Sequence, residues 1–119
     1  MRKCYDSAGL DPRNTGYVEA HGTGTQAGDT SEAAAIGTIL GTKLARGEPV
    51  AVGSIKTHIG HTEASSGLAG VISAVMAIEK GHIPPNPNFE QPNPNIPFED
   101  LNIKESHYLA NFYSYTYIR

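Results

Sequence analysis

Two stretches of this chain share one order of segments: a short run of β-forming residues, a polar turn containing glycine, and a longer stretch with helical spacing. The first stretch covers residues 15 to about 46, and the second covers residues 50 to 80. Strands that alternate with helices are typical of α/β folds, whose ligands bind beyond the carboxyl ends of the strands. The order therefore predicts an α/β layer arrangement with candidate sites at the strand ends.

In the first stretch, residues 15–21 (TGYVEAH) read as a strand that leads into residues 22–28 (GTGTQAG). Three glycines in those seven positions disfavour regular structure and indicate a loop. Asp29 precedes Glu32 by three residues, the spacing of a capping box, and apolar residues follow at helical spacing. We predict a helix from about residue 30 to 46, ended by Gly47.

In the second stretch, residues 50–55 (VAVGSI) form an apolar run too short for a helix and predict a buried strand. The polar sequence KTHIGH follows directly, at residues 56–61. From residue 62 to 80 the apolar positions cover more than half of a helix circumference. This pattern predicts a central, largely buried helix that ends at Gly81.

Residues 84–97 carry six prolines in fourteen positions and must be extended, without a hydrogen-bonded ladder of their own. A plain linker is one explanation, but Phe89 and Ile96 offer apolar anchors for packing along a surface. We expect a last short strand at residues 101–104. The segment after it changes character, because four of the six tyrosines fall within the last twelve residues.

Composition excludes several classes of function. A net charge of -3 and a pI near 5.9, without a Lys/Arg cluster, argue against a nucleic-acid partner. No apolar run is long enough to span a membrane, and a single cysteine fits a reducing, cytoplasmic compartment. The spacing fits neither a phosphate loop nor a dinucleotide fingerprint, and His58 with His61 is a weak zinc signature, so we expect no metal.

Three residues at the strand ends could carry chemistry: His21, Lys56 and His61. Two imidazoles and an ammonium would form a cationic pocket rich in hydrogen-bond donors. Such a pocket suits the stabilisation of a developing oxyanion or enolate. His21 could equally be a turn residue beside glycines, whereas an unpaired ammonium at the end of a buried strand is costly unless it has a partner or a task.

Three ordered motifs closely resemble the second half of β-ketoacyl synthase domains, especially those of iterative fungal-type polyketide synthases. They are VEAHGTGTQAGDTSE, VGSIKTHIGHTEASSGLAGV and GHIPPNPNFEQPNPNIPFEDLNIK, and the resemblance covers roughly residues 5 to 104. It implies a thiolase-like fold of two related βαβαβαββ halves, usually in a homodimer, with this chain supplying most of the second half. We therefore expect a partial C-terminal domain over residues 1–104 and a divergent tail over 105–119.

The resemblance also implies an activity. In the family, a cysteine from the first half carries the acyl chain, and malonyl on an acyl carrier protein is decarboxylated and joined to it in a Claisen condensation. The paired histidines of the family fall on His21 and His61, and its lysine falls on Lys56. Thr23 and Thr25 would hydrogen-bond the phosphopantetheine arm of the carrier protein, and the chain itself would bind no cofactor.

Some positions depart from the family pattern. The nucleophilic cysteine motif is not in this sequence, and Cys4 is expected to be structural, so the fragment alone should not condense substrates. His58 stands where relatives usually carry Asn, and Gly70 stands where stand-alone bacterial relatives tend to hold a glutamate. Two alternatives remain open: a non-catalytic half-domain that binds other synthase chains or the pantetheine arm, and an unfolded product of a damaged gene.

Overall fold

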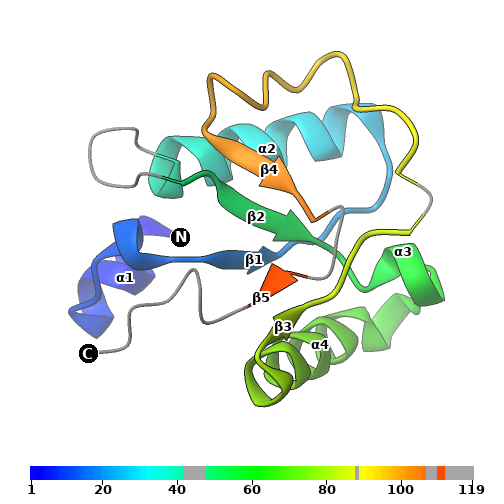
Figure 1. The fold of residues 1–119 in the computed structure, drawn as a ribbon, viewed down its shortest axis with the longest axis horizontal. Coiled ribbons are helices and arrows are strands. Elements are labelled where there is room, and N and C mark those ends of the chain that lie inside the picture. The colour runs from blue at the N-terminus through cyan, green and yellow to red at the C-terminus, as the bar shows by residue number, and fades with distance from the viewer. Residues whose placement is uncertain (42–47, 88, 107–109, 112–119) are drawn as a thin grey trace.

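The computed structural model describes the chain except for residues 42–47, 88, 107–109 and 112–119 (Figure 1). The elements follow the order α1 (Arg2–Ala8), η1 (Pro12–Asn14), β1 (Tyr17–Glu19), α2 (Gln26–Leu40), β2 (Val50–Gly53), α3 (Lys56–Ile59), η2 (Glu63–Ser65), α4 (Ser66–Lys80), β3 (His82–Ile83), β4 (Ile103–Glu105) and β5 (Ala110–Asn111).

The central feature is a three-stranded parallel sheet in the order β1, β2, β4. Tyr17 lies opposite Ala51 in the first pair, and Val50 lies opposite Ile103 in the second. A short antiparallel pair of β3 and β5 stands apart from this sheet. The α/β class and the last short strand predicted from the sequence are confirmed, although that strand lies at 103–105 rather than 101–104.

The sheet is covered on both faces because side chains alternate along each strand. Val18, Val50 and Val52 pack with Ile36 and Leu40 of α2 in the main hydrophobic cluster. Tyr17 and Glu19 point to the opposite face, where the Ser73 hydroxyl of α4 reaches the Glu19 carboxylate. Figure 1 shows α2 and α4 on either side of the strands.

The first long helix begins earlier than predicted. It starts at Gln26 rather than near residue 30, because Thr25 rather than Asp29 has the extended backbone of the N-cap. The helix ends at Gly41, and residues 42–46 of the predicted span lie outside the described part of the chain. The predicted strand 50–55 stops at Gly53, since Ile55 already has helical dihedral angles and caps α3.

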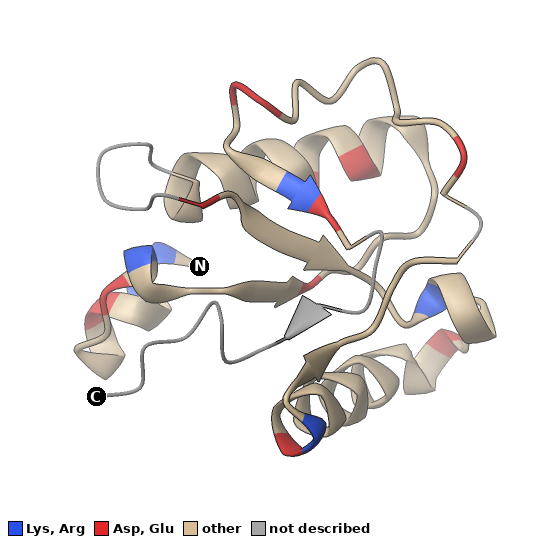
Figure 2. Cartoon of the chain, in the orientation of Figure 1, with Lys and Arg blue, Asp and Glu red and all other residues tan. Residues whose placement is uncertain are grey.

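The prediction that the second long helix is largely buried is wrong for this chain. α4 buries its small residues Ser66, Ser73 and Ala77 against the sheet side. Its large apolar side chains point outward, with exposed fractions from 48% to 69%: Leu68, Val71, Ile72, Val75, Met76 and Ile78. No charged residue interrupts this helix before Glu79 (Figure 2). The periodicity correctly indicated a helix, but its apolar face is about half exposed among the described residues.

The proline-rich segment runs over the α2 side of the sheet, as its apolar anchors predict. Ile96 and Phe98 pack against the main hydrophobic cluster. The Phe89 and Phe98 rings meet edge to face, with centroids 6.4 Å apart. The Asn86 amide ties the start of the segment to β2 and α3, through the Ser54 backbone N–H and the Thr57 hydroxyl.

Two glycines in the helices allow a matched test of this packing. A Cβ on Gly37 in α2 would lie 2.6 Å from the Cβ of Leu101, whereas a Cβ on Gly67 in α4 would meet nothing within 4 Å. Overpacking should outweigh the gain in helix propensity, so Gly37→Ala should lower the free energy of unfolding by about 1 kcal/mol. Gly67→Ala should leave it unchanged or raise it by up to about 1 kcal/mol. Urea unfolding of the chain followed by circular dichroism measures both, and equal effects would contradict the packing described for α2.

Candidate active site

The polar turns predicted at the strand ends lie side by side because β1 and β2 run parallel. The pairing continues one step beyond β1, where the Ala20 N–H donates to the Gly53 carbonyl at 2.7 Å. His21 follows directly in the chain, and Lys56 begins α3 just after β2. The two turns therefore leave the sheet at the same edge.

His21, Lys56 and His61 line one open hollow of about 460 Å³. The His21 and His61 rings meet edge to face, with centroids 5.7 Å apart and planes at 84°. The other wall comes from α4, whose Gly67 and Gly70 leave room beside the rings. Among the described residues no carboxylate forms a salt bridge with Lys56. The structure thus places the three predicted catalytic residues together.

The orientation of His61 follows from the backbone beside it. The Glu63 N–H donates to Nδ1 of His61 at 3.0 Å. A backbone amide can only donate, so Nδ1 acts as the acceptor, and a neutral ring then carries its proton on Nε2. His61 is thereby left with Nε2–H as its hydrogen-bond donor.

Thr23 and Thr25 lie outside this hollow, on the adjoining glycine loop. Both are exposed, and their hydroxyl oxygens are 3.4 Å apart. The loop itself requires glycine at two positions, since Gly22 and Gly24 have φ values of 50° and 81°. A Cβ at Gly22 would also lie 2.9 Å from the Cβ of Ser54.

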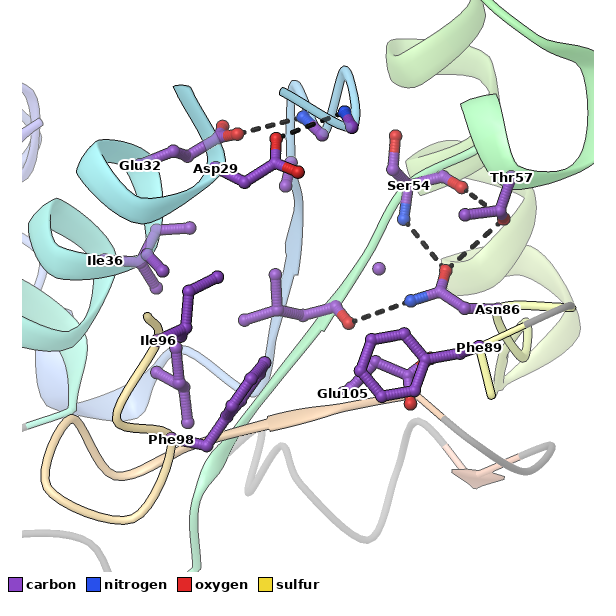
Figure 3. Close-up of a pocket in the computed structure, with 17 residues that line it drawn as sticks. Asp29, Glu32, Ile36, Ser54, Thr57, Asn86, Phe89, Ile96, Phe98 and Glu105 are labelled. Carbon is purple, nitrogen blue, oxygen red and sulfur yellow. Dashed lines mark hydrogen bonds between the residues drawn. The ribbon is translucent and has the colours of Figure 1, made fainter. Parts of the chain in front are cut away.

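Two carboxylates that the sequence assigned to a helix cap instead hold the glycine loop (Figure 3). Glu32 accepts hydrogen bonds from the His21 and Gly22 amides at 2.7 and 2.9 Å. Asp29 accepts one from the Gly24 amide at 3.2 Å. Sequence reasoning missed this role, although two acids facing a glycine-rich loop from the first turns of the next helix are a usable signal. These bonds fix the backbone that carries His21.

Glu19 is a second residue that sequence reasoning missed. Its carboxylate accepts hydrogen bonds from the Tyr17 hydroxyl at 2.7 Å, from the Ile55 amide at 2.6 Å and from the Ser73 hydroxyl at 3.0 Å. Burial raises the pKa of the Tyr17 phenol well above its usual range, and the hydrogen bond to Glu19 and the negative charge of Glu19 add to the effect. Glu19 therefore joins β1, the start of α3 and α4 at the wall of the hollow.

A second, apolar cavity of about 280 Å³ lies on the α2 side of the sheet (Figure 3). Ile36, Phe89, Ile96 and Phe98 contribute its apolar wall, and Gly22 and Gly24 of the loop lie at its border. The loop thus separates two hollows, since His21 faces the other one. The cavity was not predicted from the sequence.

Two other residues that the sequence singled out lie away from the hollow. Cys4 is exposed on α1 and is not among the residues that line it. His58 is exposed on α3, where its Nδ1 is 3.1 Å from the Thr57 hydroxyl. Within the described ranges no group of three or more His, Cys, Asp or Glu side chains could hold a metal ion. None of the described helices is long and apolar enough to cross a bilayer, and the cytoplasmic location stays a prediction.

Comparison with known proteins identifies the family. The model of the β-ketoacyl synthase C-terminal domain matches residues 1–90. A highly reducing polyketide synthase of Penicillium oxalicum is 64% identical over 104 residues, which are 87% of this chain and 4% of that protein. A phenolphthiocerol/phthiocerol polyketide synthase of Mycobacterium tuberculosis is 52% identical over 104 residues, again 87% of this chain, and 6% of that protein.

Solved structures give the same result at the level of the fold. The ketosynthase from module 1 of the bacillaene synthase of Bacillus amyloliquefaciens superposes with a TM-score of 0.83 at 34% identity, over 92% of this chain. The superposition uses 20% of the ketosynthase chain, so the present chain spans a small part of its relatives. The thiolase-like α/β fold predicted from the sequence is confirmed, and the chain belongs to the β-ketoacyl synthase family, in the C-terminal domain of polyketide ketosynthases.

Proposed function

We propose that this chain supplies the part of a ketosynthase site that stabilises negative charge on a malonyl thioester during decarboxylative Claisen condensation. The observation that carries the proposal is the convergence of His21, Lys56 and His61 on one hollow. Membership of the family favours this function over that of a non-catalytic interaction module.

The proposed reaction assigns a task to each of the three residues. When carbon dioxide leaves the malonyl group, its bonding electrons pass to the α-carbon and the thioester oxygen. His21 and His61 donate hydrogen bonds to that oxygen, and Lys56 orients the histidine pair with its positive charge. The α-carbon then attacks the acyl thioester, whose cysteine belongs to the other half of the domain, and the thiolate leaves.

The acyl carrier protein and the rest of the ketosynthase are the proposed partners, and the homodimer of the family is the proposed assembly. The exposed apolar face of α4 supports the proposal that the rest of the ketosynthase binds this chain. Six large apolar side chains without an interrupting charge form a contiguous surface that a soluble domain normally buries. The solved ketosynthases have about five times the length that this chain matches, which is enough chain to cover it. We propose that the first half of the domain packs on this face.

The catalytic proposal is tested in a chimera of the Penicillium oxalicum synthase whose matching 104 residues are replaced by those of this chain. Once the chimera condenses substrate, His21→Ala and His61→Ala should each lower the rate of malonyl decarboxylation by about 100- to 1000-fold, the cost of losing one oxyanion donor. His58→Ala is the matched control and should retain the rate, because His58 lies outside the hollow. Full activity of the His21 and His61 variants would refute the proposal.

The proposed contact with the pantetheine arm makes a separate prediction. Thr23→Val and Thr25→Val remove hydroxyls while keeping the side-chain volume. Because these hydroxyls are proposed to hold the arm, both variants of the chimera should raise the KM for the malonyl carrier protein more than they lower kcat. The lost contact weakens binding of the ground state and of the transition state equally. Steady-state kinetics measures the two constants, and an unchanged KM would exclude the contact.

The partner proposal is tested by placing charge on the α4 face. Ile72→Lys with Met76→Glu, two exposed positions of α4 that do not line the hollow, should improve the solubility of this chain alone and reduce its binding of a hydrophobic dye, because two exposed apolar side chains are replaced by charged ones. The same pair should prevent folding of the chimera, where the face is buried. Glu79→Gln, on the exposed end of α4, is the control. A folded, active chimera with both charges would show that the first half does not cover this face.

A further inference from the structure

Ser66 is a buried hydroxyl beside the candidate catalytic His61. It is the first residue of α4 and only 7% exposed. Its Oγ lies 3.3 Å from Nδ1 of His61 and 3.3 Å from the Thr62 hydroxyl. The neighbouring Ser65 differs, since it is exposed and donates to the Thr62 carbonyl at 2.8 Å.

The direction of the hydrogen bonds around Ser66 can be worked out. Nδ1 of His61 accepts from the Glu63 amide and so bears no proton. Since Nδ1 bears no proton, Ser66 is the donor in its hydrogen bond to Nδ1, and its oxygen can then accept from the Thr62 hydroxyl. The three groups form a chain from Thr62 through Ser66 to His61.

The turn beside His61 is built at a conformational cost. Glu63 has a φ of 50°, in the left-handed region that residues other than glycine rarely adopt. Such outliers persist where the surrounding structure holds them, and they cluster at functional sites. Here the turn delivers the Glu63 amide to Nδ1 from one direction, and Ser66 adds a second donor from the start of α4.

Two donors on Nδ1 restrict the ring more than one does. Rotation of an imidazole about its second side-chain torsion meets only a broad, roughly twofold barrier. A flipped ring would present carbon to Ser66 and Glu63 and lose both bonds, and the tautomer with a proton on Nδ1 would set an N–H against two donors. Only the Nε2–H tautomer in the observed orientation satisfies both.

We propose that Ser66 is a positioning residue that reinforces the Nε2–H tautomer of His61, which the Glu63 amide already favours, through a second hydrogen bond to Nδ1. The role of that proton in condensation rests on the proposed function above, whereas the tautomer itself does not.

The first experiment reads the tautomer directly in the full 119-residue chain, with ¹⁵N-labelled histidine and NMR that correlates ring nitrogens with ring protons. His61→Gln assigns the signals of His61. The unsubstituted chain should show an unprotonated Nδ1 and a protonated Nε2, and Ser66→Ala should move both nitrogens toward the average of the two tautomers. Ser65→Ala should leave them unchanged. Unchanged His61 signals in Ser66→Ala would overturn the proposal.

A second pair of variants keeps the test decisive if Ser66→Ala disturbs the fold, which the signals of the distant His82 would reveal. Ser66→Thr and Ser66→Val add the same bulk and differ only in the hydroxyl. The proposal requires a larger fraction of His61 with a proton on Nδ1 in the Val variant than in the Thr variant, because only the Thr variant keeps the second donor beside the Glu63 amide. Identical tautomers in the two variants would overturn it, because bulk rather than the hydroxyl would then decide.

Kinetics in the chimera then connects the tautomer to the reaction. Ser66→Ala should lower kcat for decarboxylation about 2- to 10-fold, the equivalent of one neutral hydrogen bond, and leave KM unchanged. A tautomer change without a change in kcat would refute the proposed use of the His61 proton and leave its positioning by Ser66 intact. Failure of the NMR prediction would refute the positioning of His61 by Ser66 and leave the proposed use of the His61 proton in the reaction intact.

Discussion

The parallel pairing of β1 with β2 is the constraint on which the candidate site depends. Tyr17, Val18 and Glu19 lie opposite Ala51, Val52 and Gly53, so the two strands end at the same level. A parallel pair needs a crossover, and α2 provides it while filling the hydrophobic cluster on one face. The residues that follow each strand are therefore neighbours in space although they are far apart in the chain. An antiparallel pair would have placed them at opposite edges.

Carboxylates then hold the turns that the sheet brings together. Glu32 and Asp29 accept the amides of the glycine loop, and Glu19 accepts the amide that precedes Lys56. Hydrogen bonds to a charged acceptor are stronger than neutral ones, which suits loops whose glycines leave the backbone mobile. The hydrogen-bond donors of the hollow thus stand on a frame of anionic acceptors. Among the described residues, that frame uses its charges on backbone amides rather than on Lys56.

The sequence predicted the alternation of strands and helices and the polar residues that meet beyond the strands, because apolar periodicity and glycine placement are local properties. It placed the strand boundaries less well, since the strands predicted at 15–21 and 50–55 span Tyr17–Glu19 and Val50–Gly53. It did not predict the start of α2. The three-residue spacing of Asp29 and Glu32 fits a capping box, but in the structure the same spacing lets both carboxylates accept amides of the preceding loop. It also did not predict the environment of α4. Periodicity identifies the apolar face of a helix, but it does not say which element of the protein that face meets, as Leu68 and Val71 demonstrate.

The distribution of polar and apolar residues on α4 connects the candidate site with the proposed interface of this chain. A helix that packs on one sheet in isolation would direct its large apolar side chains at that sheet. α4 instead directs small and polar residues there: Ser73 reaches Glu19, Ser66 reaches His61, and Gly67 and Gly70 open the hollow. The side that faces the candidate site is therefore weakly apolar, and the hydrophobic stabilisation of the helix must come from its other side. One helix can serve both purposes if a second layer packs against Leu68 and its neighbours, and the proposed covering by the first half of the domain would make the geometry of the candidate site depend on that half.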